Sequence, residues 1–515
     1  MMPSVEIPST SQFHAEEPPP NGHSRQPERS SFGGDVLKLA TGTAASQLIG
    51  ILAAPLIAHL FAPSAFGTLA IFASAAGIIS VISCFRYEVA IYLPERDEEA
   101  SKLVILCLYF VIATTLVTSL LTFLLGGEGL RMVHASELSG YLWLLPLNVF
   151  ITGVWTILNC WNQRKLRFGR ITAMQVVMRI AMTASQIALG FAGFVSGVAL
   201  IATTTFGAFA TCALLAGQTL HDDWRLFAGS LSWKAASYPW RRYNQFPRFG
   251  LAATVLNSTS FNLPSILLSG FFSTAVAGFY SFGFRVLRVP GILIGTNVNR
   301  AFFPRAAEAK QRGSLGPSVE QALQYLITLS LLPCFLLTLT GGDLFRLFFG
   351  ARWHEAGIYS QILSVWLFFW FISSPLNTVF VVLEEQRLEL RFQIANIVTR
   401  FLALLTGGLL GNARLAIALF ALCGIGVYGA YCLAVIRKSG ASMEAVQHVA
   451  LSRVALLIPV VIIFAALKLM SAPPAVIVGS ATIVLAVYYW HVLRSDPRAR
   501  RVMKHFLHYR SQHSE

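Results

Sequence analysis

The chain has 515 residues, of which 55% are hydrophobic and only 12% are charged, and its mean hydropathy is +0.62. A soluble protein of this length carries charges on roughly a quarter of its residues, so the composition excludes an ordinary soluble protein and indicates a membrane protein. The formal net charge of +15 would suit nucleic acid, but the basic residues are dispersed and form no recognised nucleic-acid module. We therefore expect no nucleic-acid partner.

The chain begins with a polar, proline-bearing stretch, and long apolar stretches follow it. Many of these reach the roughly 20 residues that a helix needs to span a bilayer. They are continuous rather than alternating in ten-residue pieces, which excludes a closed barrel and leaves helices as the way to satisfy the backbone in lipid. The sequence predicts an all-α polytopic membrane protein with about fourteen transmembrane helices. The predicted spans are 36–61, 66–93, 102–125, 140–160, 170–191, 194–217, 247–270, 274–302, 320–341, 357–382, 391–410, 413–436, 450–470 and 474–493.

A weak internal repeat indicates that the chain is built from two related halves. Phe61-Ala62-Pro63-Ser64-Ala65-Phe66-Gly67 precedes the body of the second segment, and Phe271 to Gly278 precedes that of the eighth. Two six-helix bundles separated by a linker are typical of transporters built from repeats. The predicted organisation is a disordered cytoplasmic tail at 1–35, an N-terminal bundle at 36–217, a cytoplasmic linker at 218–246, a C-terminal bundle at 247–437, an additional helix pair at 438–493 and a basic cytoplasmic tail at 494–515.

The distribution of basic residues predicts the orientation in the membrane. Alternate connections are poor in lysine and arginine, carrying only Arg131, Arg346, Arg352 and Arg414. The other connections and both tails hold most of the basic residues, and basic connections normally stay in the cytoplasm. Both termini are therefore expected to be cytoplasmic. The basic positions lie around Arg96 and Lys102, at Arg164, Lys165 and Arg167, throughout 218–248, from Arg305 to Arg312, at Arg387 and Arg391, at Arg437 and Lys438, and from Arg494 to Arg510.

Several arginines fall inside the predicted spans. Arg179 and Arg400 each lie about 13 Å along their helices from a basic residue at the segment end, which places them near the midplane. Arg285 lies about 16 Å into its segment, and Arg288 follows one turn later on the same side of the helix. An arginine facing lipid at this depth costs about 2.5–3.5 kcal/mol, so these side chains should face a wet interior. Arg86 and Arg300 lie nearer the cytoplasmic end, where extension of the side chain to the interface is an alternative explanation.

The buried arginines outnumber the acidic residues that could neutralise them. Glu88 is the only clear acidic residue inside a predicted span. We therefore predict a hydrated, positively charged cavity that receives an anion, and the planar guanidinium suits the oxygens of a phosphate. The alternative is that helix carbonyls or water satisfy the arginines. Side-chain amides inside the predicted spans would suit hydrogen bonds to sugar hydroxyls, although hydrogen bonding between helices is their commoner role. These amide residues are Asn148, Asn159, Gln175, Gln186, Asn257, Asn262, Asn297, Asn377 and Asn396.

The eighth segment carries a predicted hinge. Pro290 removes a backbone donor, and Gly291 and Gly295 loosen the helix that follows it. A kink beside two deep arginines would suit the rocking motion of a transporter, although proline kinks also occur in ordinary membrane helices.

Signatures of catalysis are absent from the sequence. No glycine-rich phosphate-binding loop occurs, so we expect no ATP hydrolysis. Neither the histidines nor the seven scattered cysteines have the spacing of metal ligands. The prediction is a protein that is not an enzyme and needs no metal or other cofactor.

Two regions resemble bacterial oligosaccharide-lipid flippases, the polysaccharide-transporter group of the multidrug/oligosaccharidyl-lipid/polysaccharide (MOP) exporter superfamily. The first is the end of the second predicted segment, and the second covers the seventh and eighth segments. The matching residues are Arg86-Tyr87-Glu88-Val89-Ala90-Ile91-Tyr92-Leu93-Pro94 with Ala100 and Leu103, Phe246-Pro247-Arg248-Phe249, Leu263-Pro264, Gly278-Phe279-Tyr280, Arg285-Val286-Leu287-Arg288-Val289-Pro290 and Ala301-Phe302-Phe303-Pro304-Arg305-Ala306-Ala307-Glu308.

This resemblance implies two six-helix bundles around a central cavity, in the bacterial inner membrane. It also implies a cargo, a polyprenyl-pyrophosphate-linked oligosaccharide for O-antigen, capsule or exopolysaccharide, with a polysaccharide polymerase and export machinery as further partners. The residues expected to bind the pyrophosphate are Arg86, Arg285, Arg288, Arg179 and Arg400. Glu88 would be either an ion-coupling carboxylate or the counter-charge that holds Arg86, and we favour the counter-charge.

Three other functions remain open at this point. A cation-coupled drug exporter of the same superfamily would need acidic residues in its cavity, where this sequence offers arginines. A membrane glycan polymerase or ligase usually needs a sizeable outer loop, and the connections predicted outside are short. A non-transporting scaffold leaves the buried charges unexplained.

Overall fold

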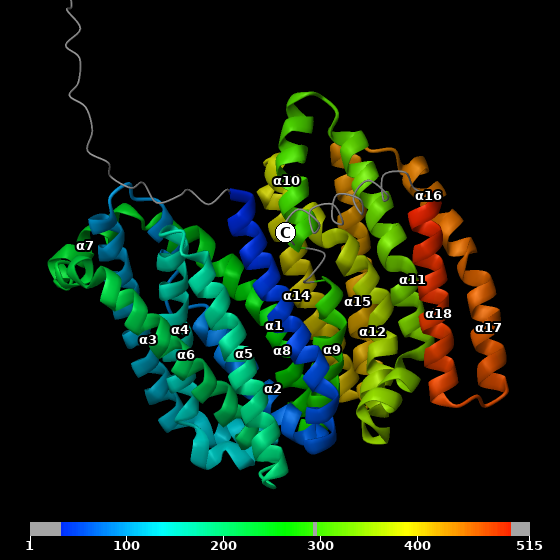
Figure 1. Cartoon of the computed structure of the whole chain (residues 1–515), viewed down its shortest axis with the longest axis horizontal. Coiled ribbons are helices and arrows are strands. Elements are labelled where there is room, and N and C mark those ends of the chain that lie inside the picture. Colours follow the sequence, from blue (N-terminus) through cyan, green and yellow to red (C-terminus); the bar gives the residue numbers. More distant parts are fainter. Residues whose placement is uncertain (1–31, 292–295, 496–515) are drawn as a thin grey trace, which may run out of the picture.

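A computed structural model describes residues 32–291 and 296–495 of the chain, and within these residues every regular element is a helix (Figure 1). Thirteen helical stretches among these residues are long and apolar enough to cross a membrane, and two of them, Ala351–Val382 and Met443–Leu469, each combine consecutive helices. The eighth predicted span accounts for the difference from fourteen, because its first part forms a helix of only 17 residues, Thr274–Pro290. The all-α polytopic fold is thus confirmed.

The N-terminal half forms six long helices, four of which (α3 to α6) occupy the left of Figure 1. Two short 3₁₀ helices, η1 (Tyr87–Tyr92) and η2 (Ser136–Tyr141), interrupt this series. The long helices are α1 (Phe32–Leu60), α2 (Pro63–Ser80), α3 (Asp97–Met132), α4 (Leu144–Arg164), α5 (Phe168–Phe191) and α6 (Gly197–Ala228).

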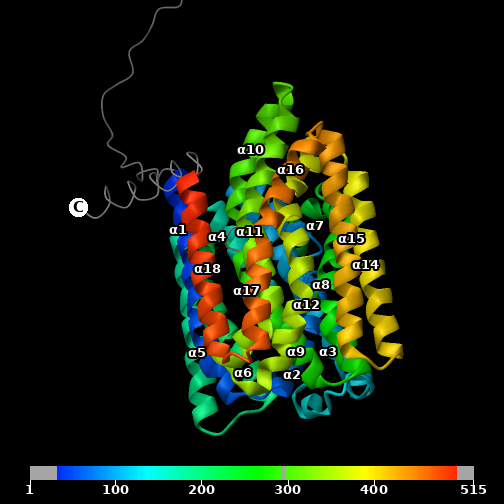
Figure 2. The same ribbon diagram turned by 90° about the vertical axis from the view of Figure 1, so that its right-hand side faces the viewer.

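The C-terminal half begins after a short linker helix, α7 (Trp233–Arg242), and a π-helical turn, η3 (Phe246–Gly250). The last two helices, α17 and α18, lie side by side at the far right of Figure 1 and in front in Figure 2. The elements of this half are α8 (Leu251–Phe271), α9 (Thr274–Pro290), α10 (Thr296–Gln311), α11 (Leu315–Phe349), η5 (Ala351–Trp353), α12 (His354–Ser373), η6 (Ser374–Leu376), α13 (Asn377–Val382), α14 (Gln386–Leu409), α15 (Ala413–Ser439), α16 (Met443–Ala455), α17 (Leu457–Leu469) and α18 (Pro474–Ser495).

Helices α2 and α9 join the two halves at one end of the molecule, which we name the closed end. Their backbones touch at the two glycines of the internal repeat: a Cβ at Gly67 would lie 1.7 Å from the carbonyl oxygen of Thr274, and one at Gly278 would lie 1.9 Å from that of Pro63. Arg352 and Trp353 also donate hydrogen bonds to the carbonyl oxygen of Ala58, at 2.7 and 2.9 Å. Only residues without a side chain allow the two helices to approach this closely.

Aromatic side chains fill the space behind these glycines. The ring of Phe66 on α2 lies 5.1 Å from that of Phe282 on α9 and 5.1 Å from that of Trp353. Phe66, Phe282 and Trp353 all belong to one buried cluster that includes residues of α1, α2, α6, α9 and α11. The closed end is therefore a packed hydrophobic contact between the halves.

Three predicted segments differ from the structure in continuity. The span at 66–93 ends as a helix at Ser80, the span at 357–382 is interrupted by η6, and the span at 450–470 begins inside α16. The linker also contains a helix, α7, that was not expected. Large apolar side chains on the outer faces, such as Leu116, Leu120 and Phe123 of α3, are exposed as lipid-facing positions require.

Candidate substrate cavity

The second segment is broken where its charged residues lie. After α2 ends at Ser80, residues 81–86 form consecutive turns, and the 3₁₀ helix η1 follows. Phe85 and Arg86 adopt left-handed backbone conformations with φ of 49° and 66°. Such conformations are uncommon for residues with a Cβ and often mark functional sites. In transporters, discontinuous helices commonly supply the substrate site.

A cavity of about 590 Å³ lies beside this break, and both halves of the chain line it. Most of its wall comes from α2, the broken segment, α4, α5 and α6, while Thr254 of α8 and Arg285 of α9 come from the C-terminal half. The remaining lining residues are Leu69, Phe72, Ala73, Ala76, Gly77, Ser80, Val81, Ser83, Cys84, Arg86, Glu88, Asn148, Thr152, Thr156, Arg179, Met182, Gln186 and Thr204.

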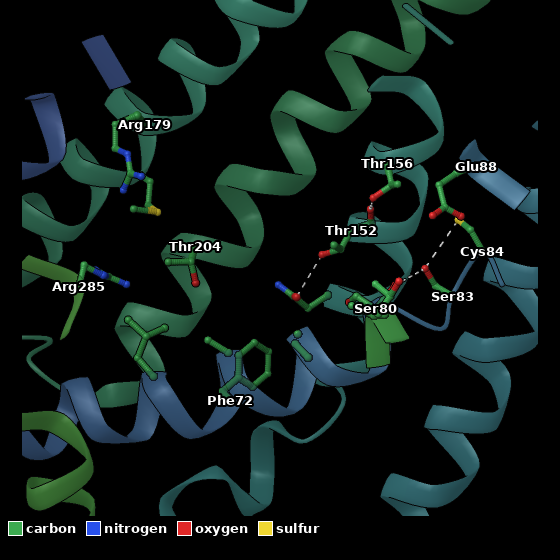
Figure 3. A pocket seen from close by; sticks show the side chains of 18 of the residues that line it. Phe72, Ser80, Ser83, Cys84, Glu88, Thr152, Thr156, Arg179, Thr204 and Arg285 are labelled. Carbon is green, nitrogen blue, oxygen red and sulfur yellow. Dashed lines mark hydrogen bonds between the residues drawn. The ribbon is translucent and has the colours of Figure 1, made fainter. Parts of the chain in front are cut away.

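Three arginines and one carboxylate supply the charge of this wall. Figure 3 shows Arg179 and Arg285 together on one side of the pocket and Glu88 on the other. Nη1 of Arg86 lies 3.5 Å from Oε1 of Glu88, whereas Nε of Arg86 and Oε2 of Glu88 have no hydrogen-bond partner among the residues that the structure describes. Within the described residues, neither Arg179 nor Arg285 has an ion pair. The cavity therefore carries an excess of positive charge.

Two of these arginines lie against glycines of other helices. A Cβ at Gly50 of α1 would lie 3.5 Å from Nη1 of Arg179, and one at Gly250, where η3 meets α8, would lie 3.5 Å from Nε of Arg86. Arg86 thus spans from the N-terminal half to the start of the C-terminal half. Neither guanidinium is held by a bidentate partner among the described residues.

The rest of the wall is rich in hydroxyl and amide groups. Asn148, Thr152 and Thr156 follow one another at four-residue spacing on α4, which puts them on one face of the helix. The Thr152 hydroxyl donates to Oδ1 of Asn148 at 3.4 Å, and the Thr156 hydroxyl donates to the Thr152 carbonyl at 2.8 Å (Figure 3). Sequence reasoning named Asn148 but missed the two threonines, although their spacing on α4 was a usable signal.

Arg288 and Arg400 are not among the residues that line this cavity. Arg400 is 2% exposed inside the C-terminal half, where its guanidinium lies over the rings of Phe261, Trp366, Phe420 and Tyr428. Arg288 shares the Phe261 ring and also contacts Phe284. The structure thus brings Arg86, Arg179 and Arg285 together and puts Arg288 and Arg400 in a separate place.

The predicted hinge coincides with the end of α9. The helix ends at Pro290, and a Cβ at Gly291 would lie 2.6 Å from the ring of Trp370. Gly295 lies outside the described residues. The position of Pro290 at a helix end agrees with the loss of its backbone donor, while motion at this point stays a prediction.

Within the described residues, no three His, Cys, Asp or Glu side chains are grouped as they would be to hold a metal ion. The seven cysteines are free thiols, buried or half-buried. The polar groups that line the cavity are guanidinium, carboxylate, hydroxyl, amide and thiol groups.

Solved structures with the same fold include two kinds of transporter. One is the lipid II flippase MurJ in an inward closed conformation, with a TM-score of 0.71 and 10% identity, covering 89% of this chain and 99% of that one. Another is a multidrug resistance MATE family transporter of the MOP superfamily in an inward-facing conformation, with a TM-score of 0.57 and 14% identity, covering 80% and 95%.

A third solved structure is a MOP superfamily transporter from Pyrococcus furiosus, described as having a binding pocket of reverse polarity that suggests a different function. Its TM-score is 0.52 at 13% identity, covering 80% of this chain and 96% of that one. At such low identity these likenesses show the fold alone.

Sequence comparison supplies the family. No curated protein sequence matches the chain. The family model described as polysaccharide biosynthesis protein matches residues 56–357, which is more than half of the chain and includes the broken second segment and all three cavity arginines. The chain therefore belongs to the polysaccharide biosynthesis protein family.

Proposed function

We propose that this protein is a flippase that moves polyprenyl-pyrophosphate-linked oligosaccharide repeat units across the bacterial inner membrane for polysaccharide export. The observation that carries the proposal is the cavity between the two halves, where three arginines face a single carboxylate. Membership in the polysaccharide biosynthesis family supports the same conclusion. With both termini in the cytoplasm, as the basic connections predict, the closed end faces the periplasm.

The arginines suit a pyrophosphate because its negative charges need several donors at once. Arg179 and Arg285 have no ion pair within the described residues, so an anion binds them without displacing a partner. Arg86 would turn from Glu88 toward the cargo, and Glu88 would hold it in place when the cavity is empty. Guanidinium groups bind phosphate oxygens in pairs, which point-charge lysines do not reproduce.

The other parts of the cargo match other parts of the molecule. Threonine hydroxyls and the amides of Asn148 and Gln186 would hydrogen-bond the sugars. The polyprenyl chain is hydrocarbon and would stay in the lipid, beside the exposed apolar outer faces of the helices. An amphiphilic cargo of this kind needs a polar cavity inside an apolar exterior, and this chain provides both.

Movement would follow from opening and closing the two ends in turn. The closed end is held by Gly67 and Gly278 and by the hydrogen bonds from Arg352 and Trp353 to Ala58. Separation of α2 from α9 would open it to the other side of the membrane. The end of α9 at Pro290 and Gly291 would allow such a tilt, with Gly295 as a third predicted hinge position.

A drug exporter of the same superfamily is the main alternative, and the charge of the cavity separates the two functions. An exporter of cationic drugs would place carboxylates where this cavity has Arg86, Arg179 and Arg285. A glycan polymerase or ligase remains an alternative of another class, and it predicts formation of a glycosidic bond rather than movement of an intact cargo.

Binding to purified protein tests the proposed cargo class. We expect farnesyl pyrophosphate in detergent micelles to bind saturably, and tetraphenylphosphonium, a lipophilic cation, to bind no more than to empty micelles. The pyrophosphate affinity should fall steeply as salt rises, because the contact is between charges. Equal or stronger binding of the cation would contradict the flippase assignment and favour the drug exporter.

A further inference from the structure

Arg400 is a buried cation without a carboxylate partner in the described residues. Nη1 donates to the carbonyl and hydroxyl oxygens of Ser260 on α8, at 3.3 and 2.9 Å, and Nη2 donates to the hydroxyl of Tyr428 on α15, at 3.4 Å. Nε has no acceptor among these residues. A guanidinium that is only 2% exposed normally needs a negative partner, because burial of an unpaired charge is costly.

Arg288 on α9 is a second cation at the same place. Its Cζ lies 5.2 Å from the centre of the Phe261 ring, and that of Arg400 lies 5.3 Å from the same ring. Nε of Arg288 is buried and also lacks an acceptor in the part of the chain that the structure describes. Neither arginine forms an ion pair within the described residues. Two guanidinium groups therefore contact the Phe261 ring without a negatively charged partner.

A third donor belongs to the same cluster. Trp366 on α12 is 1% exposed, and its indole Nε1 has no acceptor within residues 32–291 and 296–495. The indole fills the space beside Gly424, where a Cβ would lie 2.4 Å from Nε1. Gly424 lies one helical turn from both Phe420 and Tyr428 on α15, the two α15 rings that the Arg400 guanidinium contacts.

Aromatic rings stabilise the arginines but cannot accept all of their hydrogen atoms. The Arg400 guanidinium lies 4.9 to 5.9 Å from four ring centres, which is the range of cation–π contacts. The Tyr428 oxygen already receives hydrogen bonds from Arg400 and from the amide of Asn396, at 3.4 and 3.1 Å. Its own hydroxyl hydrogen is therefore free to point to another acceptor.

The cluster thus has two positive charges and at least three buried donors that lack an acceptor. We propose that Arg288, Arg400 and the Trp366 indole bind one small monovalent anion of the chloride class. The rings of Phe261 and Phe420 pack against the guanidinium groups, which favours a small ion. Because these surroundings are apolar, an ion that gives up its water more readily than phosphate does is also favoured. The site is distinct from the cargo cavity, whose lining contains none of these three residues.

Such an anion would hold the C-terminal half together. Its ligands and their neighbours come from α8, α9, α12, α14 and α15, so a single charge would connect five helices. The C-terminal half would then move as one body during transport, and its stability would depend on the anion. This inference does not rest on the identity of the cargo.

Equilibrium binding of radioactive chloride to the purified full-length protein tests the proposal, at constant ionic strength with gluconate as the replacing anion. We expect saturable binding of about one chloride per chain, with a rise in the unfolding temperature over the same concentration range. Trp366→Phe keeps an aromatic ring at this position but removes the indole N–H donor, and it should weaken chloride binding roughly tenfold. Arg400→Gln should abolish it.

Two control variants separate this site from other basic residues. Arg285→Gln alters the cargo cavity and should leave chloride binding unchanged. Arg414→Gln removes an exposed arginine that is paired with Glu355 in the same half, and it should also bind chloride normally. The proposal is overturned if the unaltered protein binds no chloride saturably, if Trp366→Phe binds it as well as the unaltered protein does, or if Arg285→Gln abolishes binding.

Discussion

Reversing the charge of Arg285 by substitution with glutamate is expected to abolish glycan export. Arg285 is the cavity arginine supplied by the C-terminal half, and it has no ion pair within the described residues. A carboxylate at this position would repel a pyrophosphate and could pair with Arg179 instead, which would remove two of the three positive charges from the site. Cells should then accumulate lipid-linked repeat units on the cytoplasmic leaflet.

Milder substitutions at the same position should give graded effects. Arg285→Ala removes the charge and the paired donors, and we expect cargo affinity to fall about 10- to 150-fold, the range for a lost hydrogen bond to a charged group. Arg285→Lys keeps the charge but loses the paired geometry, so export should recover only in part. Export is measured by surface polysaccharide, normalised to the amount of protein in the membrane.

The matched control is Arg131→Ala, because Arg131 is an exposed arginine that forms an ion pair with Glu128 on the same helix. It should export normally. Full export by Arg285→Ala at normal protein levels would contradict the assignment of Arg285 to the cargo.

Enlarging Gly278 to valine should prevent the closed end from forming. A Cβ at this position would lie 1.9 Å from the Pro63 carbonyl oxygen, so α2 and α9 must separate. Overpacking costs about 1–3 kcal/mol, which would lower the population of the closed state by about 5- to 150-fold. Spin labels at Ser64 and His354, on opposite halves, should show a longer distance, and export should fall with it.

Gly127→Val is the control for the size of the side chain, since a Cβ at Gly127 meets nothing within 4 Å. Gly67→Val should behave as Gly278→Val does, because the two glycines contact each other's helices reciprocally. A Gly278→Val variant with unchanged spin-label distances and normal export would refute the role of these glycines in closure.

Most of the helices could be predicted because the bilayer demands continuous apolar runs of defined length. The interruptions within the predicted spans could not be predicted in this way. The second segment unwinds at residues 81–86 without any proline or glycine, and the apolar run continues through Val81, Ile82 and Phe85. Tertiary contacts decide this break, since η1 packs against α3 and α4 and the Tyr87 hydroxyl donates to the Trp240 carbonyl, 3.0 Å away.

The arginines show how far a pattern of buried charges can predict a site. Arg86, Arg179 and Arg285 were expected to share a cavity, and the structure places all three in one. Arg288 was expected beside Arg285 because the two lie almost one turn apart. Three residues turn an α-helix by about 300°, which leaves the two side chains about 60° apart. On α9, which packs against both halves, that angle separates the cavity from the interior of the C-terminal half.

The repeat was the other useful signal. Gly67 and Gly278 occupied equivalent positions in two weakly similar stretches, and the structure brings them into contact. The sequence does not predict that contact, because neither stretch indicates which helix it packs against. The role of Arg400 was also hidden, since its aromatic neighbours come from three other helices, α8, α12 and α15.

Flipping by purified protein in liposomes tests the central claim most directly. A polyprenyl-pyrophosphate-linked glycan with a fluorescent sugar is placed in both leaflets, and an impermeant lectin or reductant measures the fraction that becomes accessible from outside. We predict that liposomes with the unaltered protein expose inner-leaflet cargo and that liposomes with Arg285→Glu do so no faster than protein-free ones. Equal rates with the unaltered protein and with none, under conditions where the protein is folded and correctly inserted, would contradict the account.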